Sequence, residues 1–231
     1  MSEVCWLAID TTGQGCHIGL YHLGQTITRS DMSPQSHAKL ILPMIEDLLK
    51  QAQLNRTDLT GIIYTQGPGS FTGVRIGVSV VQGLAMALNV PTLGVSSLLA
   101  LAWQGHLATA AERITAVIDA RMGQVYWGSY QLGQQMSITH ADSLSTPDVV
   151  SIDPATELLI GDVTPLIQAQ PSLEKIAHNH SATLSIETLF SLVKIGIEQG
   201  FLSWDNTLAL PVYLRHDVAA LPKKQAGIVK V

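Results

Sequence analysis

The side chains best suited to chemistry lie in a glycine-rich stretch from Gly67 to Gly77. A β-branched run at 61–66 precedes it and a long apolar helix pattern at 72–88 follows it, which predicts a strand, a tight loop and a helix in succession. Glycines let the backbone approach a ligand closely, and the first helical turn offers free N–H groups with a partial positive charge. Such a place suits a phosphate or another anion.

The spacing of this loop does not match a known nucleotide motif. The glycines at 67, 69 and 73 read G-x-G-x-x-x-G, one residue longer than the dinucleotide fingerprint, and Val74 stands where a Walker A loop has Lys. The alternative is a structural strand-to-helix turn, in which Ser70 or Thr72 caps the helix and the glycines permit close packing. The spacing alone favours this structural alternative.

Arg75 is the only charged residue of the helix pattern, and it lies at the end where the helix dipole disfavours a cation. It should therefore have an anionic partner, either the Asp10 carboxylate, which we favour, or a bound phosphate. Asp10 ends an apolar strand pattern, where it could meet a metal-bound phosphate or simply form a turn. The residues that would face a phosphate are Asp10, Thr11, Thr12, Gly67, Gly69, Ser70, Gly73 and Arg75.

Other catalytic patterns are missing from the sequence. The eight histidines are not paired at the spacing of a zinc site, and no G-x-S-x-G nucleophile elbow occurs. We therefore assign no catalytic residue and no metal ligand. Cys5 and Cys16 are expected to be reduced and buried in adjacent strands.

The composition limits the partners of the chain. Charged residues are 13% of the 231, against about 25% in soluble domains, and the net charge is −5. A net negative charge argues against nucleic-acid binding by this chain alone. No run is long enough or apolar enough to span a bilayer, because Arg75 and Gln82 interrupt the best candidate. No basic leader precedes the first apolar run, so we expect a cytoplasmic protein.

Two predicted helices, 36–53 and 72–88, are more apolar than one lobe requires. The apolar arc of the first covers about 200°, whereas a surface helix needs about 100°. Either both helices are enclosed within this chain, or another protein covers them, and the low charge favours the second alternative. The expected partner interface is Leu40, Ile41, Met44, Ile45, Leu48, Val74, Gly77, Val78, Val81 and Leu84.

The length of the chain allows one large domain or two small lobes that share a cleft, and the order of the elements indicates that a second lobe begins after about residue 105. The first lobe is expected at 1–105. The second, 106–231, begins with a β-hairpin whose turn holds Asp119 and Arg121, and its tail is expected to be loose from about 217. No role follows from the sequence for these two turn residues.

Five segments of the chain resemble the bacterial TsaB (YeaZ) family. They are 7–12, with Asp10-Thr11-Thr12; the loop 67–77; the run 85–96, ending Pro91 to Ser96; 119–127; and 211–215, Pro-Val-Tyr-Leu-Arg. The resemblance extends over nearly the whole chain and is weakest between about 131 and 199. It implies an α/β, two-lobed actin/hexokinase/Hsp70-like (ASKHA) fold with a ribonuclease H-like motif in each lobe.

The resemblance also implies a role in making threonylcarbamoyladenosine next to the anticodon of tRNA. Family members are non-catalytic paralogues of the transferase TsaD, which they bind and activate through the two apolar helices, and the ATPase TsaE joins the assembly. Alone, such chains form homodimers. The resemblance implies no cofactor held tightly by this chain, with ATP and metal in the partners, and contact with tRNA only through the complex.

The resemblance further implies that this chain is a pseudo-enzyme. TsaD carries two metal-binding histidines at positions that align with Ser97 and Leu101 here, and a hydroxyl and an alkyl group cannot rebuild an iron or zinc site. Two alternatives stay open. One is a nucleotide-binding ATPase or kinase-like enzyme that uses Asp10, Thr11, Thr12 and the glycine loop, and the other is a glycopeptidase-like hydrolase.

Overall fold

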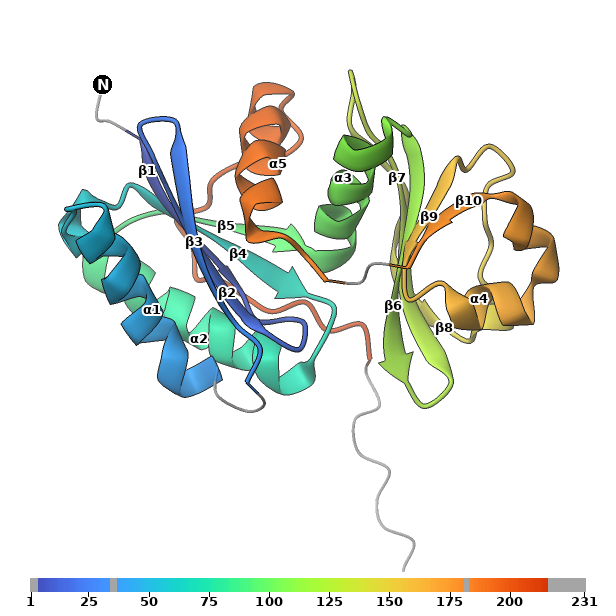
Figure 1. The fold of residues 1–231 in the computed structure, drawn as a ribbon, viewed down its shortest axis with the longest axis horizontal. Coiled ribbons are helices and arrows are strands. Elements are labelled where there is room, and N and C mark those ends of the chain that lie inside the picture. The colour runs from blue at the N-terminus through green and yellow to red at the C-terminus, as the bar shows by residue number, and fades with distance from the viewer. Residues whose placement is uncertain (1–3, 34–36, 181–182, 216–231) are drawn as a thin grey trace, which may run out of the picture.

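The computed structural model describes residues 4–33, 37–180 and 183–215. The chain folds into two five-stranded mixed sheets with helices around and between them (Figure 1). The predicted α/β class is therefore confirmed. The first residue of the predicted helix 36–53 and the tail expected to be loose from about 217 lie outside the described residues.

The first sheet has the strand order β3-β2-β1-β4-β5. Strand β1 lies in the centre, which suits its apolar run from Cys5 to Ile9; it pairs antiparallel with β2 and parallel with β4. Helices α1 and α2 cover one face of this sheet (Figure 1). These elements are β1 (Cys5–Asp10), β2 (Cys16–His22), β3 (Gln25–Asp31), α1 (His37–Gln51), β4 (Gly61–Gly67), α2 (Phe71–Leu88) and β5 (Thr92–Ser96).

The second sheet repeats the topology of the first, in the order β10-β9-β6-β7-β8. Three antiparallel strands are followed by a parallel strand beside the central one, as in the first sheet. This repetition is that of two ribonuclease H-like motifs. The elements are β6 (Arg113–Arg121), β7 (Gln124–Gln131), β8 (Ser137–Ser145), β9 (Leu158–Gly161), α4 (Thr164–Ala169) and β10 (Ala177–Asn179), with 3₁₀ turns at Arg56–Asp58, Pro147–Val149 and Pro171–Lys175.

Two helices, α3 (Ser97–Thr109) and α5 (Ile186–Glu198), lie between the sheets (Figure 1). Helix α3 packs on β6, β7 and β9 of the second sheet, and α5 packs on β1 and β2 of the first. One continuous core contains buried side chains from both sheets and both helices. Helix α5 and the segment 204–213 come from the expected second lobe, 106–231, but contact the first sheet. The division at 106 itself stays a prediction.

Candidate functional site

A cleft of about 1370 Å³ separates the carboxyl ends of the central strands of the two sheets. Both lobes line it, and the lining residues include Asp10, Thr12, Ser97, Asp119 and Asp162. The cleft therefore gathers the Asp10 turn, the glycine loop and the Asp119 hairpin, which are far apart in the sequence. The residues predicted to face a phosphate therefore have to be examined in this cleft.

Asp10 acts as a turn former. Its side chain is buried, and its Oδ1 accepts hydrogen bonds from Thr12 N (2.9 Å), Thr12 Oγ1 (2.7 Å) and Thr65 Oγ1 (2.5 Å). These three donors fix the carboxylate inside the first lobe. The favoured ion pair between Asp10 and Arg75 is not formed, so that prediction is wrong.

The glycines of the loop make room for the backbone of the Asp10 turn. A Cβ on Gly73 would overlap the carbonyl oxygen of Thr11, and one on Gly69 would overlap that of Thr12. A Cβ on Gly77 would overlap Thr11 Oγ1, and that hydroxyl donates to the carbonyl of Gly73 (2.7 Å). Glycine at these positions thus lets Thr11 and Thr12 lie directly against the loop.

At the start of α2, the N–H groups of Ser70 and Gly73 donate hydrogen bonds to other groups of the protein. Ser70 Oγ accepts from Gly73 N (3.3 Å), and Ser70 N donates to the carbonyl of Thr12 (2.7 Å). Ser70, rather than Thr72, is therefore the cap. These contacts are those of the structural alternative, in which the helix start anchors the turn of β1. Gly69, Ser70 and Gly73 also line the cleft, and their role in facing a phosphate stays a prediction.

Arg75 has an aromatic partner in place of the predicted anion. Its guanidinium carbon lies 3.5 Å from the centroid of the Phe71 ring, and its Nε donates to Tyr213 Oη (2.8 Å). Cation–π contact and this hydrogen bond hold the cation at the exposed start of α2. The predicted carboxylate partner was wrong because Tyr213 lies 138 residues away in the sequence and cannot be found from local spacing.

The start of α3 brings Ser97 and Leu101 to the wall of the cleft. Ser97 Oγ donates to Thr12 Oγ1 (3.1 Å), so its hydroxyl helps to stabilise the Asp10 turn. Within 4–33, 37–180 and 183–215, no group of three His, Cys, Asp or Glu side chains is close enough to hold a metal ion. The residues at the start of α3 thus supply a hydroxyl and an alkyl group, neither of which suits iron or zinc.

The second lobe contributes carboxylates that are engaged with its own hairpin. Asp119 accepts from Arg121 N (2.8 Å) and pairs with Arg121 Nη1 (3.1 Å), while Asp162 Oδ2 accepts from Asp119 N (2.8 Å). Arg121 and Met122 have φ of 64° and 55°, the left-handed region. Asp119 thus stabilises a tight turn.

A partly buried polar cluster joins the two sheets, and no sequence motif predicted it. Asp142 accepts from Ser96 Oγ (2.5 Å) and from Tyr130 Oη. Burial raises the pKa of Asp142 and raises that of Tyr130 well above its usual value. Ser96 also caps α3, accepting from the N–H groups of Leu98 and Leu99. The cluster has no local signature, since its members come from three separate elements.

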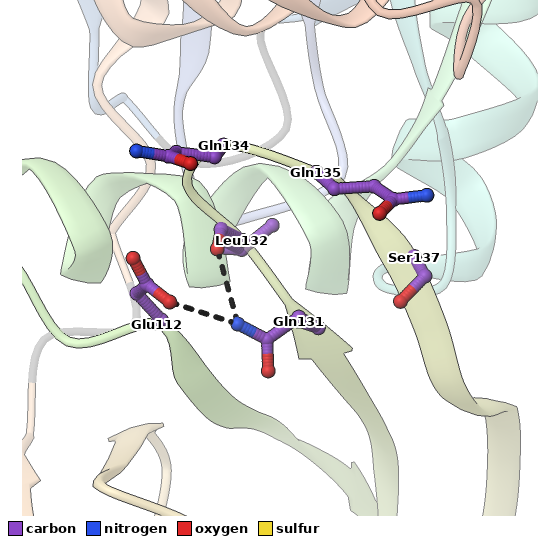
Figure 2. Close-up of a pocket in the computed structure, with 6 residues that line it drawn as sticks. All are labelled: Glu112, Gln131, Leu132, Gln134, Gln135 and Ser137. Atoms are coloured by element: carbon purple, nitrogen blue, oxygen red, sulfur yellow. Dashed lines mark hydrogen bonds between the residues drawn. The ribbon is translucent and has the colours of Figure 1, made fainter.

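A smaller hollow of about 300 Å³ lies on the second lobe (Figure 2). Gln131 Nε2 donates to Glu112 Oε2 (3.1 Å) and to the carbonyl of Leu132 (3.3 Å). Figure 2 shows Gln134 and Gln135 pointing to opposite sides. Its polar groups pair mainly with one another, so we assign it no function.

Both cysteines are free and buried, in the adjacent strands β1 and β2, as predicted. Burial raises the pKa of the Cys5 thiol to about 11 and that of the Cys16 thiol to about 12. Both remain protonated and unreactive at neutral pH.

The ten residues expected to form a partner interface are mostly enclosed by the first lobe. Leu40 and Leu84 are half-buried and Gly77 is buried against Thr11, while the other seven lie in the core between the helices and the first sheet. Those seven are Ile41, Met44, Ile45, Leu48, Val74, Val78 and Val81. The prediction that they are unpaired surface is wrong, because the sheet's own face covers them.

Apolar surface nevertheless remains on the opposite side of these helices. Met86 is 80% exposed and Leu42 is 51% exposed, and Pro43, Gly83 and Ala87 are exposed as well. We call these five residues the outer helix face. By length and composition α2 could also cross a membrane, contrary to the sequence expectation, but Val74, Val78 and Val81 pack it onto the sheet.

Comparison with known proteins agrees with this fold. The family model described as TsaD, tRNA N6-adenosine threonylcarbamoyltransferase, matches residues 30–220. The tRNA threonylcarbamoyladenosine biosynthesis protein TsaB of Escherichia coli (strain K12) is 43% identical over 125 residues, which cover 54% of this chain and 54% of the relative. The chain thus matches about half the length of that curated relative.

Two further relatives match over greater lengths. The protein of the same name from Buchnera aphidicola subsp. Schizaphis graminum (strain Sg) is 31% identical over 180 residues, covering 75% of this chain and 85% of the relative. A crystal structure from Pseudomonas aeruginosa, described as an uncharacterized protein with similarity to peptidase YEAZ, has a TM-score of 0.82 at 37% identity and covers 92% of this chain and 100% of that chain. With the ASKHA arrangement of its two lobes, this chain belongs to the TsaB (YeaZ) family.

Proposed function

We propose that this chain takes part in threonylcarbamoyladenosine biosynthesis on tRNA, as a non-catalytic subunit that binds and activates the transferase TsaD. The names of its relatives and the match to the TsaD family model support the pathway. The assembly would include the ATPase TsaE, reach tRNA only as a complex, take its ATP and metal from the partners, and work in the cytoplasm. Alone, the chain would form a homodimer.

The single observation that carries the non-catalytic role is how the glycine loop is occupied. Thr11 and Thr12 fill the space that the glycines leave, and Ser70 caps the helix that would otherwise receive a phosphate. A nucleotide-using enzyme would need this space for its ligand. The side chains of Ser97 and Leu101 argue in the same way against a metal-dependent glycopeptidase.

The outer helix face is the surface we propose for TsaD. It presents exposed apolar and small residues from two neighbouring helices, which suits helix-to-helix packing with close backbone approach. A Cβ added at Gly83 would meet no atom within 4 Å, so the backbone of another helix could approach this position. The core residues named above would support this face from within.

The test is the substitution Met86→Glu. The side chain is exposed, so the chain should fold, and an unpaired carboxylate in the contact should weaken TsaD binding by about tenfold or more. Val149→Glu is the matched control, because Val149 is 63% exposed on the other lobe. Binding measured by titration calorimetry with purified TsaD should fall for Met86→Glu alone; equal affinities of both variants would contradict the proposed surface.

A further inference from the structure

The segment 209–215 runs from the first lobe to the second along the edge of the cleft. On the first lobe it is held by side chains and backbone of β4: Tyr64 Oη accepts from Leu210 N (3.0 Å), and Val212 N donates to the carbonyl of Gln66 (2.8 Å). These contacts fix its course as far as Val212.

Tyr213 holds the same segment to the start of α2. Its hydroxyl accepts from Arg75 Nε (2.8 Å), and its ring centroid lies 5.8 Å from that of Phe71. The segment is thus anchored to the first lobe on two elements, β4 and α2, before it reaches the opposite wall.

Arg215 makes the contact with the second lobe. Its Nη2 donates to the carbonyl of Ala120 (2.9 Å), and its Nη1 lies 3.1 Å from Met122 Sδ. Ala120 lies near the end of β6 and Met122 in the turn that follows it, and both line the far wall of the cleft. We propose that Arg215 is a latch that holds the two lobes together across the open side of the cleft.

On the side away from Arg215, the two lobes are held together by a shared core, so loss of the Arg215 contacts should let them separate only on the cleft side. There the lobes share one apolar core through α3 and α5, and Asp142 ties β8 to Ser96. Separation on that side would expose buried side chains, whereas separation on the cleft side breaks the exposed contacts of Arg215. The shared core can therefore act as a hinge, and the lobes can move apart on the side where Arg215 bridges them.

The test measures the distance between the lobes with spin labels. Ser79→Cys on α2 and Ser151→Cys on the second lobe are exposed sites, and native Cys5 and Cys16 are buried and protonated, so labelling is selective. The labelled full chain is compared with its Arg215→Ala and Arg215→Lys versions. Arg56→Ala is the matched control, because it removes an equal charge from an exposed ion pair on the first lobe.

We expect Arg215→Ala to lengthen the mean distance and broaden its distribution. Arg215→Lys should give an intermediate result, since lysine can still donate to the carbonyl of Ala120 but lacks the second arm of the guanidinium. The control should match the unsubstituted chain. If Arg215→Ala gives the same distribution as Arg56→Ala, the latch is refuted, even if the segment 209–215 itself becomes more mobile.

Discussion

Asp142 is a partly buried carboxylate that accepts hydrogen bonds from two hydroxyl groups and lies near His140. Burial raises its pKa above the usual 3.8, with the hydrogen bonds from Ser96 and Tyr130 acting in the opposite sense. At low pH both folded and unfolded chains carry the protonated acid. As pH rises above 3.8, the unfolded chain ionises first, so the free energy of unfolding falls until the folded-state pKa is passed.

Because the free energy of unfolding should fall as Asp142 becomes ionised, the substitution Asp142→Asn should change how stability depends on pH. The amide does not titrate, so the unfolding free energy of the variant minus that of the parent should shift in favour of the variant between about pH 4 and pH 7. Urea denaturation at several pH values measures it, and the contributions of the other acids cancel in the difference. A difference that stays constant, or moves the other way, would show that the pKa is not raised in the folded chain.

Single residues also show where sequence reasoning reaches its limit. The sequence correctly indicated that Ser70 could cap α2, because that argument depends on neighbours within one helical turn. For Arg75 it predicted an anionic partner, whereas the structure has Tyr213 and Phe71. It indicated the wrong partner because Tyr213 comes from the end of the chain. Asp142 was missed for the same reason, since its donors lie 12 and 46 residues away.

Two of the three glycines in helix α2, Gly73 and Gly83, have opposite surroundings. The space beside Gly73 is filled by the carbonyl of Thr11, whereas Gly83 faces open space. Glycine is therefore required at the first position for packing and is intrinsically unfavourable at the second.

This contrast predicts opposite effects of one substitution. Gly73→Ala should lower the free energy of unfolding by about 1–3 kcal/mol, because backbone must move to admit the methyl group. Gly83→Ala should raise it by about 1 kcal/mol. Chemical denaturation of both variants compares them on the same helix; equal effects would mean that the loop and the Asp10 turn do not pack as described.

At the level of elements, hydrophobic periodicity predicted α1 and α2 but not what covers them. It correctly indicated that both helices are too apolar for an isolated surface position. The pattern cannot distinguish a sheet of the same chain from a partner, because both bury the same side chains. The residues left outside, such as Met86 and Leu42, could be identified only when the helices were placed on the sheet.

The charge of the whole molecule is divided unevenly between its lobes. Residues 112–180 contain eight acidic and three basic side chains, so this segment carries a net charge as large as the −5 of the whole chain. Such a lobe repels a phosphate backbone.

We therefore expect no tRNA binding by the purified chain alone. Anisotropy of labelled tRNA at about 0.1 M salt should not change on titration with this chain, and should change once TsaD is added if the proposed assembly forms. Saturable binding by the chain alone, weakening steeply with salt, would contradict this expectation.

The order of elements along the chain also determines when, during synthesis, the first sheet can be covered on both faces. Helix α5 covers the face of β1 and β2, where Phe190 lies against Tyr21, and Trp204 follows to cover Trp6. During synthesis the first sheet leaves the ribosome well before residues 186–204 are made, so its aromatic face stays exposed to water until then. A nascent chain therefore exposes these aromatic side chains until α5 has emerged, and we expect a holding chaperone to bind it most strongly at lengths just short of α5.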